Sequence, residues 1–226
     1  MTISDTLLRV RMLTVGFGPN RVVKDLDFDV ARGGALGIVG ESGSGKSMTS
    51  LAIMGLLPKG AKRTGSIEFD GAELTALPER AMRSFRGDRI AMIFQDPLSS
   101  LNPYYTVGTQ IMEAYRSHRS GVTRRQARKV AIEAMERVHI SDAARRVDHY
   151  PHQFSGGMRQ RVMIAMTLSM EPELIIADEP TTALDVTVQA QILDLLAEIR
   201  ADTGAGLILI THDLAVVSEV TDHIVV

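Results

Sequence analysis

The sequence GESGSGKS at residues 40–47 most constrains what this chain can fold into, because it fills every fixed position of the pattern G-x-x-x-x-G-K-[ST]. The continuous apolar run ALGIVG at 35–40 enters this loop and is typical of a strand buried on both faces of a parallel sheet. The stretch SMTSLAIMGLL at 47–57 leaves the loop as a predicted helix that ends before Pro58. A strand, a glycine-rich loop and a helix in this order predict an α/β core with an anion site at the helix N-terminus.

Different residues of this loop are expected to play different roles. Backbone N–H groups are expected to face phosphate oxygens, Lys46 to place a positive charge beside the β- and γ-phosphates, and Ser47 to offer its hydroxyl to Mg²⁺. The candidate nucleotide-binding residues of the loop are Gly40, Glu41, Ser42, Gly43, Ser44, Gly45, Lys46, Ser47 and Met48. A turn that binds nothing is the alternative, which the flanking strand and helix disfavour. The loop alone does not separate kinases, GTPases and ATPases, although the chain lacks the guanine-reading pattern N-K-x-D.

The rest of the chain alternates between predicted strands and helices. Residues 1–35 predict antiparallel strands around a turn at Gly18-Pro19-Asn20. Further strands are predicted at 65–71, 88–95, 173–180 and 206–213, and helices at 186–204 and 214–222. This alternation predicts a mostly parallel sheet flanked by helices.

Residues 96–160 differ in character and predict a helical subdomain inserted into the α/β core, which would comprise 1–95 and 161–226. Apolar residues recur at helical spacing in TRRQARKVAIEAMERV at 123–138. The basic residues of this helix are expected to form a solvated face. A nucleic-acid patch is the alternative, and the lack of interleaved aromatic residues disfavours it.

Composition narrows the class of protein further. The formal net charge of −2 argues against a chain that coats nucleic acid, and the absence of cysteine excludes disulfides, iron–sulfur clusters and thiol catalysis within it. No window approaches 18 apolar residues, and the start of the chain does not read as a secretory signal. We therefore expect a soluble, cytoplasmic chain whose membrane role, if it has one, depends on a partner.

Polar side chains follow three of the predicted strands. In LIIADEP, Asp178 and Glu179 stand at the carboxyl end of an apolar strand. An aspartate there can hold the Mg²⁺ shell, and the next carboxylate can act as general base on the attacking water. An acidic strand end that caps a helix is the alternative. Gln95 and His212 end two further strands, so that Gln95 is a candidate sensor of metal and water and His212 a candidate contact of the γ-phosphate. The sequence places these residues at strand ends and does not establish that they converge.

A second glycine loop, SGGM at 155–158, also runs into a predicted helix but carries no lysine in the phosphate-binding position. GESGSGKS, the Gln95 loop, FSGGMRQR, LIIADEP, ALD at 183–185 and ITHD stand in the order and approximate spacing of an ABC transporter ATPase subunit. Nearly the whole chain resembles this family. Within the family, FQDPLSSLNP and FSGGMRQRVMIAM resemble the ATPases of bacterial oligopeptide, dipeptide and nickel importers.

The resemblance implies a P-loop NTPase (RecA-like) core with a small antiparallel β subdomain and the inserted α-helical subdomain. It implies ATP and Mg²⁺ as ligands, with the metal near Ser47, Gln95 and Asp178. Two ATPase subunits, identical or different, would pair head to tail, so that each ATP lies between the phosphate loop of one and the SGGM loop of the other. The nucleotide contacts implied by this pairing are Ser155, Gly156, Gly157, Met158 and Asp185.

The resemblance also implies partners. These are transmembrane permease subunits, an extracytoplasmic substrate-binding protein acting indirectly, and no nucleic acid, with the chain peripheral on the cytoplasmic face of the inner membrane. Peptide is the expected solute, and nickel and other small solutes are the less favoured alternatives. The connector 96–107, with Leu98, Tyr104 and Tyr105, is expected to receive a permease helix; packing inside the helical subdomain is the alternative for the tyrosines.

The chain departs from the family pattern in three places. Met158 stands where the family usually has glutamine, and no tyrosine precedes Tyr104, so Phe17 is the candidate for stacking on adenine, with a core phenylalanine as the alternative. Family members normally continue beyond HIVV with more strands and, in this branch, a further segment. Two other functions stay open: a soluble ABC ATPase that clamps ribosomes or DNA, and an ATP-binding regulatory module, which Glu179 disfavours.

Overall fold

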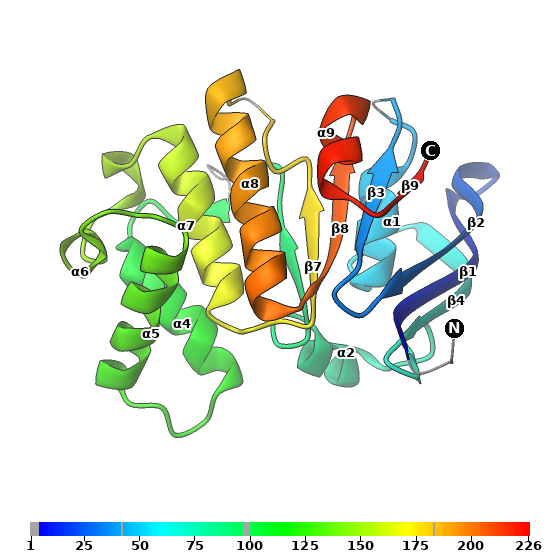
Figure 1. Cartoon of the computed structure of the whole chain (residues 1–226). Coiled ribbons are helices and arrows are strands. Elements are labelled where there is room, and N and C mark those ends of the chain that lie inside the picture. The colour runs from blue at the N-terminus through cyan, green and yellow to red at the C-terminus, as the bar shows by residue number, and fades with distance from the viewer. Residues whose placement is uncertain (1–4, 42, 97–99, 183) are drawn as a thin grey trace.

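The computed structural model describes residues 5–226 except 42, 97–99 and 183 (Figure 1). Its strands form two sheets. The antiparallel sheet has the order β2-β1-β4-β5, and the parallel sheet the order β6-β7-β8-β3-β9. The strands are β1 (Thr6–Phe17), β2 (Asn20–Ala31), β3 (Ala35–Val39), β4 (Ala61–Phe69), β5 (Ala72–Glu73), β6 (Ile90–Ile93), β7 (Leu174–Asp178), β8 (Gly206–Thr211) and β9 (His223–Val225).

Helices cover the parallel sheet and fill the region between β6 and β7. They are α1 (Lys46–Ile53), α2 (Glu79–Phe85), α4 (Val107–His118), α5 (Arg124–Arg137), α6 (Ala143–Arg146), the 3-10 helix η2 (Pro151–Gln153), α7 (Gly156–Leu168), α8 (Val186–Thr203) and α9 (Leu214–Val220). Helix α7 runs through residue 160 without a break. The division of the chain at 160/161 therefore falls inside a helix, and the division itself stays a prediction.

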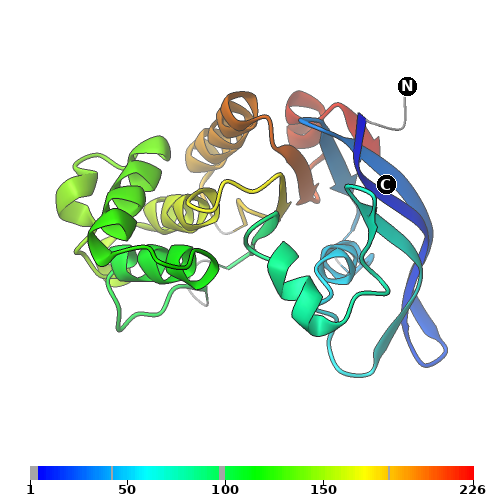
Figure 2. The ribbon, with the colours of Figure 1, turned by 90° about the horizontal axis from the view of Figure 1, so that it is seen from below.

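The parallel sheet is apolar on both faces, as the continuous apolar runs predict. Every residue of β3, β7 and β8 is buried. Because successive side chains of a strand alternate between faces, Ile38 packs with α1 and the antiparallel sheet, whereas Val39 packs in the cluster that contains α7, α8 and α9. Figure 2 shows α8 and α9 on one side of this sheet and α1 on the other.

Several element ends differ from the sequence predictions. Helix α1 ends before Pro58 as predicted, but it ends at Ile53 and not at Leu57, because Gly55 takes a left-handed backbone conformation (φ 63°) that turns the chain. Strand β6 covers 90–93 and not the whole of 88–95, so Gln95 follows it by two residues. Strand β4 begins at Ala61, before the predicted 65. The sequence patterns did not predict α2, α4, α6, β5 or β9.

An ion-pair network joins the two sheets at the ends of the strands opposite the phosphate loop. Arg89, which precedes β6, contacts Glu173 (2.5 Å) and Asp70 (2.5 Å), and Arg32 pairs with the same two carboxylates. The Arg89 guanidinium also lies 5.0 Å from the centre of the Phe69 ring. These contacts connect the turn after β4 to the residues that immediately precede β6 and β7.

Helix α9 packs so closely on β3 that Gly37 has no room for a side chain. A Cβ atom at Gly37 would lie 2.0 Å from Cγ1 of Val217. We expect Gly37→Ala to lower the free energy of unfolding by about 1–3 kcal/mol, because overpacking forces the helix off the sheet. Urea denaturation measures this loss. The matched test is the same substitution in a Val217→Ala background, where the clashing methyl is gone and the loss should shrink; an equal loss in both backgrounds contradicts the packing explanation.

Candidate functional site

The phosphate loop follows β3 and passes directly into α1. Gly45 precedes the helix with a φ of 98°, and a Cβ there would lie 2.3 Å from the backbone oxygen of Val22 on β2. A side chain at this position would push the loop off the antiparallel sheet. The tight turn leaves the first N–H groups of α1 directed out of the helix, as an anion site requires.

Lys46 is the buried cation of the loop, with an exposed fraction of 7%. Its ammonium donates hydrogen bonds to the backbone oxygens of Gly40 (2.8 Å) and Glu41 (2.8 Å). It also lies 3.9 Å from Oε1 of Glu179. These contacts compensate for the loss of water around the charge and hold it at the centre of the loop.

Asp178, the last residue of β7, lies beside the first turn of α1. Its carboxylate accepts hydrogen bonds from the hydroxyls of Ser47 (3.1 Å) and Ser50 (3.5 Å), and the residue is 5% exposed. Burial raises the pKa of Asp178 above the ordinary aspartate range, while the bond from Ser47 acts in the opposite direction.

Ser47 and Asp178 together present hard oxygen donors that fit Mg²⁺. Among the residues that the structure describes, no group of three or more His, Asp or Glu side chains is arranged to hold a metal. Mg²⁺ usually keeps several waters and is bound through one or two protein carboxylates together with substrate phosphate oxygens. Gln95, the third expected metal contact, donates its side-chain N–H to Glu179 (3.1 Å), and its role toward a metal stays a prediction.

The polar side chains that follow the strands converge on Glu179. Its Oε2 atom accepts hydrogen bonds from Gln95 (3.1 Å) and Thr182 (3.0 Å) and lies 3.7 Å from Nδ1 of His212. The backbone of Glu179 has a φ of 46°, a left-handed conformation that is uncommon outside glycine. The structure thus brings together Gln95, Glu179 and His212, whose convergence the sequence could not establish.

Two hydroxyl groups of this cluster were not identified from the sequence. Ser50 and Thr182 contact the two acidic side chains, Asp178 and Glu179 respectively. Thr182 lies three residues after Glu179, a spacing that is compatible with a turn, but no sequence pattern indicates that its hydroxyl faces the carboxylate.

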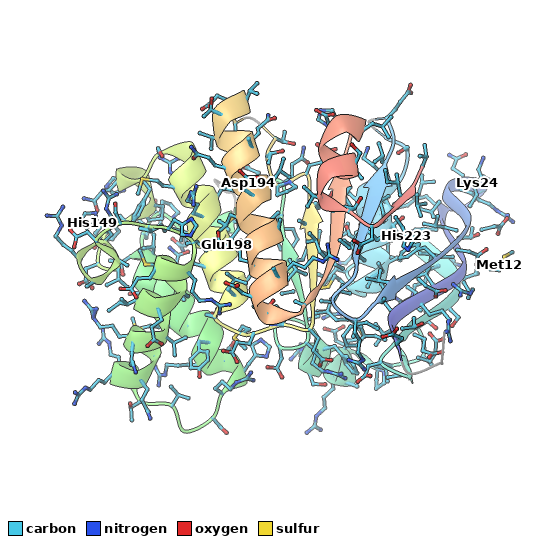
Figure 3. All side chains as sticks on the ribbon, in the orientation of Figure 1. Met12, Lys24, His149, Asp194, Glu198 and His223 are labelled. Carbon is cyan, nitrogen blue, oxygen red and sulfur yellow. The ribbon has the colours of Figure 1, made fainter. Side chains whose placement is uncertain are left out.

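A cavity of about 640 Å³ adjoins the phosphate loop. It is lined by the loop, by residues 21–24 of β2, and by Val225 and Val226. Lys24 is exposed on β2 (Figure 3).

Phe17 is not among the residues that line this cavity. It ends β1 with an exposed fraction of 38%, and its role toward adenine stays a prediction. Ser42, also a candidate, lies outside the described residues.

The second glycine loop begins α7 on the surface. Ser155 caps the helix by accepting a hydrogen bond from the N–H of Met158 (3.4 Å), and Ser155 and Gly156 are exposed. Met158 accepts a weak hydrogen bond from Arg146 through its sulfur (3.6 Å). A Cβ at Gly157 would lie 2.5 Å from Val188 on α8, so the two helix N-termini pack closely together.

Asp185, expected at the nucleotide, has a local partner in this chain. Its carboxylate caps α8 by accepting a hydrogen bond from the N–H of Val188 (3.0 Å). The N-termini of α7 and α8 and the carboxyl ends of the parallel strands lie at the same edge of the molecule, at the top of Figure 1. Helices α7 and α1 nevertheless lie well apart in both Figures 1 and 2, so one chain presents its two glycine loops at separate places.

No helix among the described residues is both long enough and apolar enough to span a bilayer.

Comparisons with known proteins agree on one family. A family model described as ABC transporter matches residues 23–182. The dipeptide transport ATP-binding protein DppD of Escherichia coli K12 is 53% identical over 227 residues, which cover 97% of this chain and 68% of that protein. The oligopeptide transport ATP-binding protein OppD of Salmonella typhimurium LT2 is 49% identical over 227 residues, which cover 99% of this chain and 68% of that protein.

Solved structures show the same similarity. A dimeric ATP-binding cassette in a post-hydrolysis state, bound to ADP and Pi, superposes with a TM-score of 0.80 at 29% identity, covering 93% of this chain and 90% of that one. The protein cbiO1 of Clostridium perfringens, part of the ABC transporter complex cbiONQ, superposes with a TM-score of 0.83 at 28% identity, covering 96% of this chain and 83% of that one.

The buried carboxylate of Asp178 gives a prediction about stability. Its raised pKa means that the folded chain keeps this proton to higher pH than the unfolded chain does. Stability therefore falls as pH rises from the unfolded aspartate pKa, about 3.9, to the folded value, and the full penalty is present at neutral pH. We expect Asp178→Asn to raise stability at pH 7 by on the order of 1 kcal/mol, roughly 2–4 °C in melting temperature.

Thermal unfolding at pH 7 and at pH 3 measures this effect. The gain should disappear at the lower pH, where the wild-type carboxyl is protonated in both states. Asp185→Asn is the matched control, because asparagine caps a helix as well as aspartate does and Asp185 is not buried. A gain of equal size at both pH values would show that charge burial is not its cause.

Proposed function

The chain belongs to the ABC transporter family, and on this basis we propose that it binds ATP with Mg²⁺ and hydrolyses it as the ATP-binding subunit of a peptide importer. The observation that carries the proposal is the position of Glu179. Its carboxylate lies at the end of β7, 3.9 Å from the Lys46 ammonium and within reach of Gln95 and His212.

Each residue of the cluster has a task in this reaction. Lys46 and the N–H groups of the loop hold the phosphates, and their positive charge offsets the charge that develops during transfer. Ser47 and Asp178 would hold Mg²⁺, which when bound neutralises phosphate charge. Glu179 accepts a proton from the attacking water, Gln95 orients that water, and His212 donates a hydrogen bond to the γ-phosphate.

The second glycine loop completes the site in a pair of subunits. Ser155 and Gly156 are exposed at a helix N-terminus without a lysine, and they lie apart from the phosphate loop of their own chain. A head-to-tail pair brings the Ser155 hydroxyl, the N–H groups of Gly156 and Gly157, and Met158 to the nucleotide held by the other subunit. The solved cassette bound to ADP and Pi is a dimer, which supports this arrangement. The partner is a second ABC ATPase subunit, the same or different.

The importer assignment rests on the relatives, which are named for dipeptide and oligopeptide transport. The subunit would lie peripherally on the cytoplasmic face of the membrane, bound to permease subunits that receive solute from an extracytoplasmic binding protein. Tyr104 and Tyr105 support a contact with the permease, because they are 84% and 53% exposed and not packed inside the helical segment. Leu98 of the same connector lies outside the described residues.

The substitution Glu179→Gln tests the catalytic assignment. The amide keeps the size and polarity of the side chain but does not accept the proton, so turnover should fall about 10²–10⁴-fold while ATP binding persists. Phosphate release and equilibrium nucleotide binding measure the two properties. The control is Glu136→Gln, a change of the same kind at an exposed position of α5. Near-normal phosphate release by the Glu179 variant rejects the role of this carboxylate.

The substitution Tyr104→Ala tests the permease contact. Removal of an exposed aromatic anchor should reduce co-purification with the permease at least about tenfold, and nucleotide binding should be unchanged because the residue lies outside the ATP site. The matched control is Met12→Ala, which removes an exposed apolar side chain from the antiparallel sheet (Figure 3). Equal assembly of the Tyr104 and Met12 variants with the permease would place the contact elsewhere.

A further inference from the structure

We propose that the hydroxyl of Thr182 positions the carboxylate of Glu179, and that turnover depends on this hydrogen bond. The inference rests on the proposed function, in which Glu179 accepts the proton of the attacking water. Thr182 does not itself contact substrate in this account; it acts through Glu179.

The backbone places Thr182 beside Glu179. The residues 179–182 form a turn in which the N–H of Thr182 donates to the backbone oxygen of Glu179 (3.2 Å). Glu179 is in turn fixed to the sheet, because its own N–H donates to the backbone oxygen of Ile210 on β8 (2.9 Å). Pro180, between them, is buried and restricts the turn further. Both ends of the side-chain contact are therefore held by backbone hydrogen bonds.

The hydroxyl contact selects one orientation of the carboxylate. Thr182 donates to Oε2 of Glu179 (3.0 Å), and with this oxygen fixed, Oε1 faces the Lys46 ammonium (3.9 Å). Threonine is suited to this task because its branched side chain has few allowed χ1 rotamers. The hydroxyl is thus directed at the carboxylate with little loss of side-chain entropy.

The other contacts of Oε2 come from more exposed groups. Gln95 is exposed in the segment after β6, and the side chain of His212 is 66% exposed. In the proposed reaction both also have tasks at the water and the γ-phosphate, so their contacts with Glu179 must change during the cycle. Thr182 is partly buried and belongs to the same turn as Glu179, and it can keep its contact while the others exchange.

The test compares three substitutions in the full chain, with ATP turnover measured over a range of ATP concentrations. Thr182→Val keeps the shape of the side chain but removes the donor, and we expect kcat to fall about tenfold, the effect of one hydrogen bond to a charged group. KM for ATP and nucleotide affinity should stay within about twofold of wild type, because the phosphate loop is untouched. Thr182→Ser, which restores a hydroxyl, should recover most of the lost kcat.

Thr181→Val is the matched control. It makes the same change one residue earlier in the same turn, where the hydroxyl has no hydrogen bond within the described part of the chain, and it should leave kcat near wild type. A second readout is Thr182→Val in a Glu179→Gln background, where the residual turnover should show no further loss because the carboxylate is already absent.

Three results would overturn the inference: an unchanged or higher kcat in Thr182→Val, a serine variant no better than valine, or a full additional loss in the Glu179→Gln background. These results leave the proposed function intact provided that Glu179→Gln alone lowers turnover by the expected factor of about 10²–10⁴. Normal turnover by Glu179→Gln alone would instead reject the catalytic assignment of Glu179, and with it the premise of this inference.

Discussion

Two opposite charges buried at the edge of an apolar sheet organise this molecule. Lys46 and Asp178 are 7% and 5% exposed, and neither charge would be tolerated there without polar partners. The partners come from the loop and from the helix that follows it. The oxygens of Gly40 and Glu41 accept from the ammonium, and the hydroxyls of Ser47 and Ser50 at the start of α1 donate to the carboxylate. The hydrogen bonds that give the phosphate loop its shape are therefore the same ones that hold its reactive groups in place. A loop that changed shape would leave a charge buried without compensation.

The rest of the fold supplies rigidity to that edge. Strands β3, β7 and β8 are buried throughout, and each face of the sheet packs into a separate apolar cluster. Polar groups then emerge where the strands end, and the strand spacing alone brings side chains from β7 and β8 close together. The tight packing of Gly37 against Val217 shows how little freedom remains beneath the site.

Sequence patterns predicted the parts of the molecule that obey one strong local rule. The phosphate loop, the capped helix at 124–137 and the buried strands at 35–39 and 174–178 follow from glycine spacing, helical periodicity and continuous apolar runs. The ends of α1 and β6 do not follow from such a rule, because apolar residues continue past both ends. Leu56 and Phe94 continue the apolar patterns but are 40% and 43% exposed. The contact of Thr182 was not predicted, because it depends on the geometry of a turn. That geometry includes the left-handed φ of Glu179, which the residue types do not indicate.

The close contact between α7 and α8 has a mechanical consequence. Gly157 has no side chain, and this lets the first turn of α7 rest directly on Val188, whose N–H is bound by the cap residue of α8, Asp185. A displacement of the first turn of α8 would therefore press directly on the first turn of α7, which begins next to Ser155.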